Sequence, residues 1–158
     1  MIILGIDPGT TATGYAVLET GGRLCVLKAG LVSIKGSSSP ERLIELWRET
    51  KKIIRKWNPE RVAIEKLFLA RNQKTAMAVA EARGVILLTT SLAGPRVYEY
   101  TPLEVKKIVT GDGNADKLQV KKMLQLTFPE LRELRARDDV FDAIAIALTC
   151  HFRERRNV

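Results

Sequence analysis

Hydrophobic positions in the first part of the chain fall into three short runs separated by turn residues. The runs cover residues 1–7, 13–20 and 24–34, and they are rich in Val, Ile and Leu. Gly21 and Gly22 separate the second run from the third, as in a tight turn. This pattern predicts three consecutive strands that form an antiparallel meander.

The hydrophobic pattern then changes from strand-like to helical. Ser39 and Pro40 resemble the N-cap and first position of a helix. Apolar residues follow at helical spacing, and these are Leu43, Leu46, Trp47, Ile53, Ile54 and Trp57. We expect both tryptophans to lie in the core and Pro59 to end the helix.

The rest of the chain mixes short apolar strands with helices. Strands are predicted at residues 61–64, just before Glu65, and at residues 96–100. Helices are predicted at residues 74–92 with an interruption at Gly84, and at residues 102–109, 116–126 and 139–155. The pattern predicts one α/β domain over residues 1–158, with a mixed sheet in which a three-strand antiparallel meander joins further strands, flanked by helices.

Charge and cysteine content narrow the choice of partner and compartment. The 158 residues carry 26 Lys and Arg against 18 Asp and Glu, a net charge of +8. A small basic domain fits a polyanionic partner, although the excess could serve solubility alone. No window approaches about 18 uninterrupted apolar residues and no signal peptide is present, so we expect no membrane contact. Cys25 and Cys150 are far apart and predict reduced thiols in a cytoplasmic protein.

Two acidic residues stand at the ends of predicted strands. Asp7 ends the first strand, and Glu65 ends the fourth. In open α/β sheets, ligands bind at the carboxyl ends of strands. Each acid alone could be a polar strand terminus, but two at one edge repel each other unless a cation such as Mg²⁺ neutralises them.

The last predicted helix supplies more acids. Asp139 and Asp142 share a helix face, and so do Asp138 and Asp142, so the spacing does not choose between the pairs. Asp138 and Asp139 could instead cap the helix and complement its dipole. Asp142 precedes the apolar run at residues 143–148, which favours a site over a cap.

Together these acids predict a four-carboxylate cluster suited to two-metal phosphoryl transfer. Two metal ions can clamp the attacking water and the leaving oxygen of a phosphodiester. The turn that follows Asp7 fits this chemistry, because glycine lets backbone approach a phosphate, and amides and hydroxyls can bind one. The predicted phosphate-binding residues are Gly9, Thr10 and Thr11.

Four ordered segments resemble the signature segments of the RuvC-type Holliday junction resolvases. They are GIDPGTTATGYAV, AIEKLFLARNQKTAMAVAEARGV, YTPLEVKKIVTGDGNADKLQVKKML and DDVFDAIAIAL. The resemblance covers essentially the whole chain. It implies a ribonuclease H-like fold with a five-stranded sheet, a homodimer, and Mg²⁺-dependent nicking of four-way DNA junctions in recombination and repair. It further implies up to two Mg²⁺ per subunit, replaceable by Mn²⁺, and RuvA- and RuvB-type branch-migration partners.

The resemblance also implies roles for individual residues. The metal ligands would be Asp7, Glu65, Asp139 and Asp142, which selects Asp139 over Asp138. Phe68 matches an aromatic that stacks on a base, although it could be a core residue. Lys106 and Lys117 match lysines near the scissile phosphate, although they could belong to a solvated basic face. Further DNA contacts would come from Arg71, Asn72 and Lys74.

Three alternative functions share some of these features. The GIDPGTT segment also resembles the phosphate-binding turn of actin-like ATPases, which need two such lobes where this chain has one. A ribonuclease H-like nuclease acting on RNA precursors would share the Asp at the strand tip. A metal-free junction-binding module would not need all four acids.

A symmetric dimer is expected because resolving a junction requires two paired nicks. The predicted helix at residues 74–92 has a run of small apolar residues around much of its circumference, namely Ala76, Met77, Ala78, Val79, Ala80 and Ala82. Such a helix is buried in its own core or packs against a copy of itself. We expect the second arrangement.

Overall fold

The computed structural model describes residues 1–9, 12–66 and 73–155, which contain one five-stranded sheet. The strand order is β3-β2-β1-β4-β5. Neighbours pair antiparallel from β1 to β3, and β4 pairs parallel with both β1 and β5. The strands are β1 (Ile2–Asp7), β2 (Ala12–Glu19), β3 (Cys25–Ser33), β4 (Arg61–Glu65) and β5 (Arg96–Tyr100). The predicted meander and mixed sheet are confirmed.

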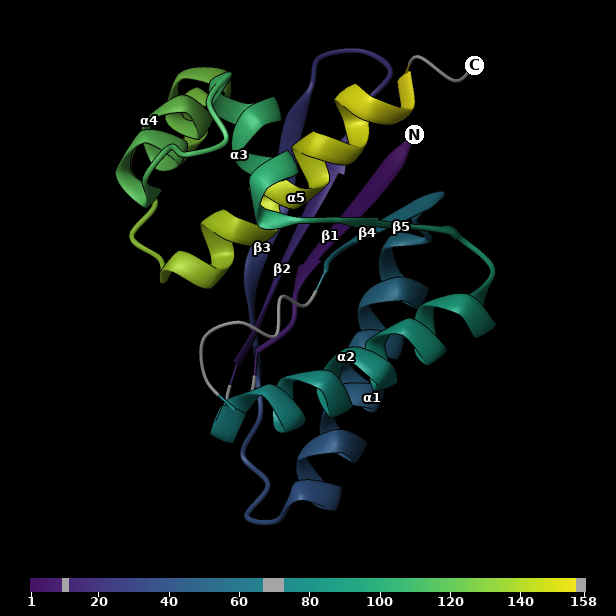
Figure 1. Cartoon of the computed structure of the whole chain (residues 1–158). Coiled ribbons are helices and arrows are strands. Elements are labelled where there is room, and N and C mark those ends of the chain that lie inside the picture. The colour runs from purple at the N-terminus through teal and green to yellow at the C-terminus, as the bar shows by residue number, and fades with distance from the viewer. Residues whose placement is uncertain (10–11, 67–72, 156–158) are drawn as a thin grey trace.

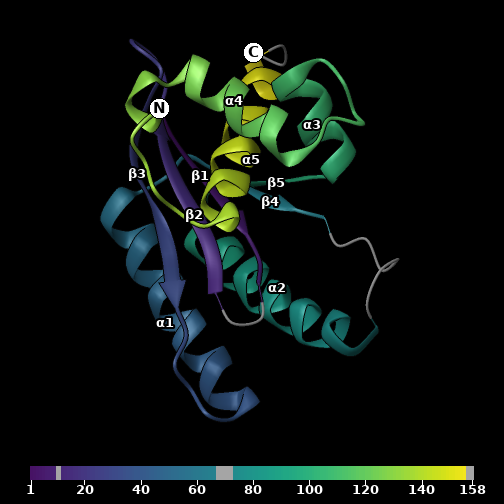
Figure 2. The same ribbon diagram turned by 90° about the vertical axis from the view of Figure 1, so that its left-hand side faces the viewer.

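Helices cover both faces of the sheet (Figures 1 and 2). On one face lie α1 (Ser39–Trp57) and α2 (Gln73–Ala93). On the other lie α3 (Pro102–Thr110), α4 (Lys117–Thr127) and α5 (Asp138–Glu154), with a short 3₁₀ turn at Pro129–Leu131 before α5. Of the helices, α5 makes the main contact with β1 and β2.

Two hydrophobic cores result because successive strand residues point to opposite faces. In β1, Leu4 and Ile6 join the core beneath α1 and α2. Ile3 joins the core beneath α5, as does Ala63 of β4. By the same alternation, Asp7 and Glu65 lie on the face covered by α5.

Three local predictions are wrong. The N-cap of α1 is Ser38, one residue before the predicted Ser39, and its side chain accepts a hydrogen bond from the Glu41 amide. Helix α2 continues through Gly84, because one helical glycine costs only about 1 kcal/mol, less than packing contributes. Trp47 is 41% exposed on α1, whereas Trp57 packs against the core as expected.

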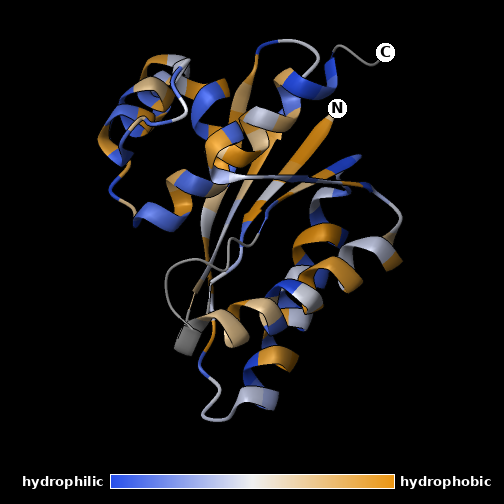
Figure 3. Cartoon of the chain, viewed as in Figure 1, coloured by the Kyte–Doolittle hydropathy of each residue, from blue (hydrophilic) through white to orange (hydrophobic). Residues whose placement is uncertain are grey.

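Helix α2 carries an unusual amount of exposed apolar surface. Its Ala76–Ala93 segment is apolar enough, by length and composition alone, to cross a membrane, yet only 22% of it is buried. Glu81 and Arg83 interrupt this segment, so it is not a run of about 18 uninterrupted apolar residues, the pattern that a membrane span was expected to show. The segment contains Arg83, which forms an ion pair with Glu99 of β5 and would be costly to place in lipid. Apolar residues follow the helix along its length (Figure 3).

Candidate active site

Two neighbouring parallel strands deliver acids to the same edge of the sheet. Asp7 is the last residue of β1, and Glu65 is the last residue of β4. The register pairs Ile6 with Ile64, so the two acids follow directly after paired residues. The predicted position of Asp7 and Glu65 at the ends of their strands is therefore confirmed.

Two glycines allow α5 to approach this edge closely. A Cβ at Gly5 would overlap the Ala143 carbonyl, and one at Gly14 would overlap the Asp139 carbonyl. Gly14 is also the register partner of Asp7. The start of α5, which contains Asp139 and Asp142, is therefore seated beside Asp7.

The four acids form one electrostatic unit. Burial, together with the charges of Glu65, Asp142 and Asp139, raises the pKa of Asp7 from 3.8 to about 8. Burial and Asp142 raise the pKa of Glu65 to about 7. Burial is also the main reason that the pKa of Asp142 is raised. Asp139 acts on the pKa of Asp7, and both Asp138 and Asp139 act on the pKa of Asp142, so the choice of Asp139 over Asp138 stays a prediction.

Among the described residues, two cations form ion pairs with the acids of α5. Lys117, at the start of α4, places Nζ 3.5 Å from Asp142 and 3.4 Å from Asp138. Arg137 Nε lies 3.0 Å from an Asp139 carboxylate oxygen. Sequence reasoning identified Lys117 but missed Arg137, whose position just before a helix carries no periodic signal.

The donor set fits a hard divalent cation, which binds oxygen ligands such as carboxylates. Buried acids whose pKa values rise because they face one another are the arrangement that a cation would relieve. In the described part of the chain, no three acidic, histidine or cysteine side chains yet surround a common point as metal ligands. The predicted cluster is therefore a set of neighbouring charges rather than a formed coordination shell.

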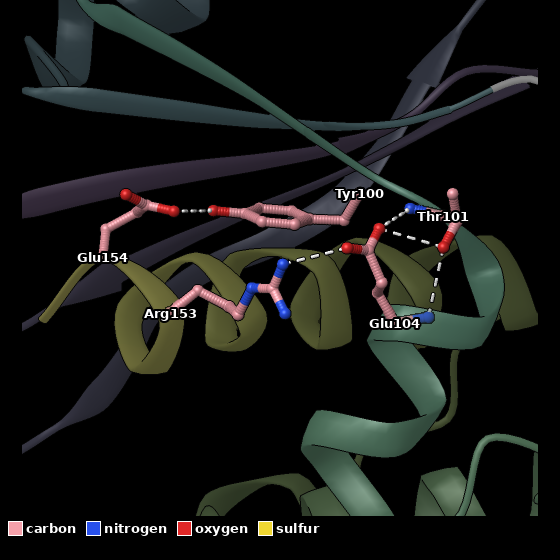
Figure 4. A network of polar contacts seen from close by, with 5 residues as sticks. All are labelled: Tyr100, Thr101, Glu104, Arg153 and Glu154. Atoms are coloured by element: carbon pink, nitrogen blue, oxygen red, sulfur yellow. Dashed lines mark hydrogen bonds and ion pairs between the residues drawn. The ribbon is translucent and has the colours of Figure 1, made fainter. Parts of the chain in front are cut away.

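Lys106 lies on α3, which a polar network fastens to α5 (Figure 4). Thr101 and Glu104 cap α3 reciprocally, and Arg153 of α5 donates to Glu104 at 3.0 Å. Tyr100 donates its hydroxyl hydrogen to Glu154 at 3.0 Å. Among the described residues, Lys106 forms no ion pair with the four acids, so the structure does not bring it into the group.

Several predicted residues lie outside the described part of the chain. These are Thr10, Thr11, Phe68, Arg71 and Asn72, as well as the side chain of Lys74. Gly9 is described, and a Cβ there would overlap the Ala12 carbonyl, so the turn after Asp7 requires glycine. The predicted contacts of these residues with phosphate and DNA remain predictions.

A basic groove that the sequence did not reveal lies next to Arg137. It has a volume of about 1050 Å³ and is formed by α4 and the segment before α5. Its lining contains four cations and one acid, namely Lys121, Arg132, Arg135, Arg137 and Glu133. Leu134 and Ala136 pack against the core, which turns the arginines outward. Through Arg137 the groove adjoins the acidic edge of the sheet.

Sequence comparison places the chain among known nucleases. A sequence model of the family described as crossover junction endodeoxyribonuclease RuvC matches residues 3–151. The RuvC of Pelotomaculum thermopropionicum is 43% identical over 153 residues, which cover 96% of this chain and 92% of the relative. That of Caldicellulosiruptor saccharolyticus is 43% identical over 161 residues, covering 100% and 96%.

Solved structures agree with the sequence comparison. Thermus thermophilus RuvC superposes with a TM-score of 0.88 at 33% identity, covering 99% of this chain and 97% of the other. The same protein in complex with a Holliday junction substrate gives a TM-score of 0.91 at 32% identity, covering 99% and 96%. These similarities confirm the ribonuclease H-like fold. With a family match over nearly its whole length, the chain belongs to the RuvC family of crossover junction endodeoxyribonucleases.

Proposed function

We propose that this protein is a Mg²⁺-dependent endonuclease that resolves four-way DNA junctions by paired, symmetric nicks in recombination and repair. The main observation is the convergence of four acids, from two strands and one helix, at one sheet edge of a RuvC-family chain. The structural relative in complex with a Holliday junction supports the choice of substrate. The cytoplasm and RuvA- and RuvB-type partners belong to the same proposal.

The acidic residues would hold the metal. Asp7, Glu65, Asp139 and Asp142 would be the ligands, and bound Mg²⁺ would activate water and stabilise charge on the phosphodiester. Because burial raises the pKa of Asp7 and of Glu65, these acids hold protons near neutral pH until a cation displaces them.

The cations around the acids would hold the DNA backbone. Lys117 and Arg137 are ion-paired with Asp142 and Asp139, and a metal at those carboxylates would release both cations to bind phosphate. The basic groove would continue these contacts along one DNA arm, since phosphate contacts position a duplex without reading its sequence. Lys106 would contact the scissile strand from α3.

The exposed apolar face of α2 would form the dimer interface. Met77, Leu88 and Leu92 are 72%, 61% and 78% exposed. Large contiguous apolar patches on soluble proteins mark sites of association. A second copy packed on α2 would bury this face and hold two sites in fixed relation, as an isologous interface does.

The deciding experiment uses a synthetic four-way junction and a matched linear duplex, each with and without Mg²⁺. We expect paired nicks in the junction only, only with Mg²⁺, and with 5′-phosphate ends. The Asp7→Asn variant should bind the junction and leave it uncut, because binding rests on backbone contacts. Equal cutting of the duplex, or cutting by the variant, would contradict the proposal.

A further inference from the structure

Another cavity, lined by apolar surface together with two arginines and a histidine, lies at the opposite end of the sheet from Asp7. It has a volume of about 550 Å³, within the usual size range of small-molecule sites. Arg61 begins β4 there, and His151, Phe152 and Arg155 approach from the end of α5. Among the described residues that line it, none is acidic.

Arg61 is the most informative residue of this cavity. It is only 8% exposed, and a buried charge is costly unless it is paired. Within the described residues its guanidinium forms no ion pair with a carboxylate, and it lies over the Tyr98 ring, whose centre is 5.9 Å away. An anion bound in the cavity could therefore neutralise the charge of Arg61.

His151 shows that the same region is electrically positive. It is 8% exposed, and its Nδ1 atom is buried with no hydrogen-bond partner in the described structure. Burial lowers the pKa of His151, and the charges of Arg155 and Arg61 lower it further. Two guanidinium groups thus act on one buried imidazole, which is an arrangement that an anion would stabilise.

We propose that this cavity binds a small organic phosphate. The guanidinium groups of Arg61 and Arg155 would hold the phosphate, because arginine binds phosphate oxygens through two parallel hydrogen bonds. The apolar body of the ligand would lie against Leu24 and Phe152, which also line the cavity. A free nucleotide and a phosphorylated DNA end both offer this chemistry.

The site is separate from the acids at the other end of α5. Along α5, Asp142 and His151 are nine residues apart, which is about 14 Å at 1.5 Å per residue. The inference does not rest on the proposed nuclease function, and cleavage of junctions serves as an independent measurement. The chain contains a single histidine, His151, so one imidazole signal reports on the cavity directly.

The test follows the NMR signal of the His151 imidazole in the full chain, at constant NaCl concentration and pH. Four ligands are added in separate titrations: AMP, adenosine, and a four-nucleotide DNA with and without a 5′-phosphate. We expect AMP to shift the signal saturably and adenosine to leave it in place. A shift with the 5′-phosphorylated DNA alone would assign the site to DNA ends, and a shift with AMP alone to free nucleotides. No saturable shift with either phosphate, or an equal shift with adenosine, would overturn the proposal.

Variants connect the shift to the two arginines. Arg155→Gln, at an exposed position, and Arg61→Gln should each weaken AMP binding about tenfold or more, as expected for loss of charge-assisted hydrogen bonds. Lys52→Gln on α1, across the sheet, should leave binding unchanged. Melting curves check that the Arg61→Gln variant folds. If it does not fold, AMP binding by the Arg155→Gln variant alone tests the assignment. Unchanged binding in the folded arginine variants would contradict the assignment.

Discussion

Gly14 of β2 lies directly beneath the backbone carbonyl of Asp139 in α5, so closely that a Cβ on Gly14 would overlap the carbonyl oxygen. Gly14 is also the register partner of Asp7. One glycine thus sets how near the acids of the helix come to the acid of the strand. Asp139 and Asp142 are among the charges that raise the pKa of Asp7.

We therefore expect Gly14→Ala to separate α5 from the sheet at the acidic edge. The added methyl group should destabilise the fold by about 1–3 kcal/mol, as overpacking does. Junction cleavage should fall more than the population of folded protein does. Melting curves and cleavage rates measured together test this. Gly22→Ala is the matched control, because a Cβ there meets no atom within 4 Å, and full activity in Gly14→Ala would show that the close approach is unnecessary.

A second prediction concerns Asp7 and pH in the absence of divalent ions. The folded-state pKa of Asp7, about 8, lies above its ordinary value of 3.8, so folded protein holds the proton more tightly than unfolded protein. Stability is then full below about pH 4 and is lost as the pH rises toward about 8. The Asp7→Asn variant carries no ionisable group at this position, so its stability should not fall in this way. At about pH 9 we expect its free energy of unfolding to exceed that of the wild type by about 1–3 kcal/mol. This is less than the full pKa shift implies, because the neighbouring charges share the shift.

Melting curves across pH measure this difference. Added Mg²⁺ should raise the wild-type melting temperature at high pH and should raise that of Asp7→Asn much less, because a ligand that binds folded protein stabilises it. If the melting temperatures of wild type and variant run parallel from about pH 5 to about pH 9, Asp7 is not a coupled buried acid.

The sequence was sufficient for the parts of the fold and site that depend on local pattern. Alternating apolar residues and turn signals located the meander, and position at strand ends located Asp7 and Glu65. Spacing could not separate Asp138 from Asp139, because both share a helix face with Asp142. In the structure Gly14 of β2 packs against the Asp139 carbonyl, a contact between distant elements that spacing does not reveal, and the choice between the two acids stays a prediction.

Features that depend on distant residues could not be read from the chain. The basic groove joins Lys121 of α4 to Arg135, which meet only in three dimensions. Arg137 pairs with Asp139 across a helix start, where no periodicity marks it. Trp47 follows the helical hydrophobic spacing, yet it lies at the exposed margin of that face, where Lys51 covers its ring at 4.7 Å.

The third prediction separates the adjacent acids of α5. Asp138 is two-thirds exposed and pairs with Lys117, whereas Asp142 is one of the charges that raise the pKa of Asp7. We expect Asp142→Asn to abolish cleavage and Asp138→Asn to lower it less than about fivefold, the effect of a surface ion pair worth up to about 1 kcal/mol. Single-turnover cleavage measures both variants, with junction binding as the control. Equal loss in both would show that the helix register of the site is wrong.

The fourth prediction tests the basic groove through the salt dependence of binding. Each phosphate contact contributes about 0.9 to the slope of log affinity against log salt concentration. The double variant Arg132→Ala and Arg135→Ala should therefore reduce the magnitude of the slope by about 2 and weaken binding to every junction sequence alike. Arg48→Ala with Lys52→Ala, on α1 across the sheet, is the control. An unchanged slope in the groove variant would remove the groove from the DNA interface.

The last prediction concerns the dimer and the exposed face of α2. Met77 is 72% exposed in one chain, and a second copy packed there would bury it. Met77→Glu would place a charge in that interface, so we expect a folded monomer that nicks one strand and fails to make paired nicks, because an unpaired buried charge is costly. Leu27→Glu on the edge strand β3, where Leu27 is 39% exposed, is the matched control and should remain dimeric. Light scattering gives the mass, and a junction held in a plasmid distinguishes single from paired nicks. A wild-type protein that is monomeric on the junction while making paired nicks would exclude this interface.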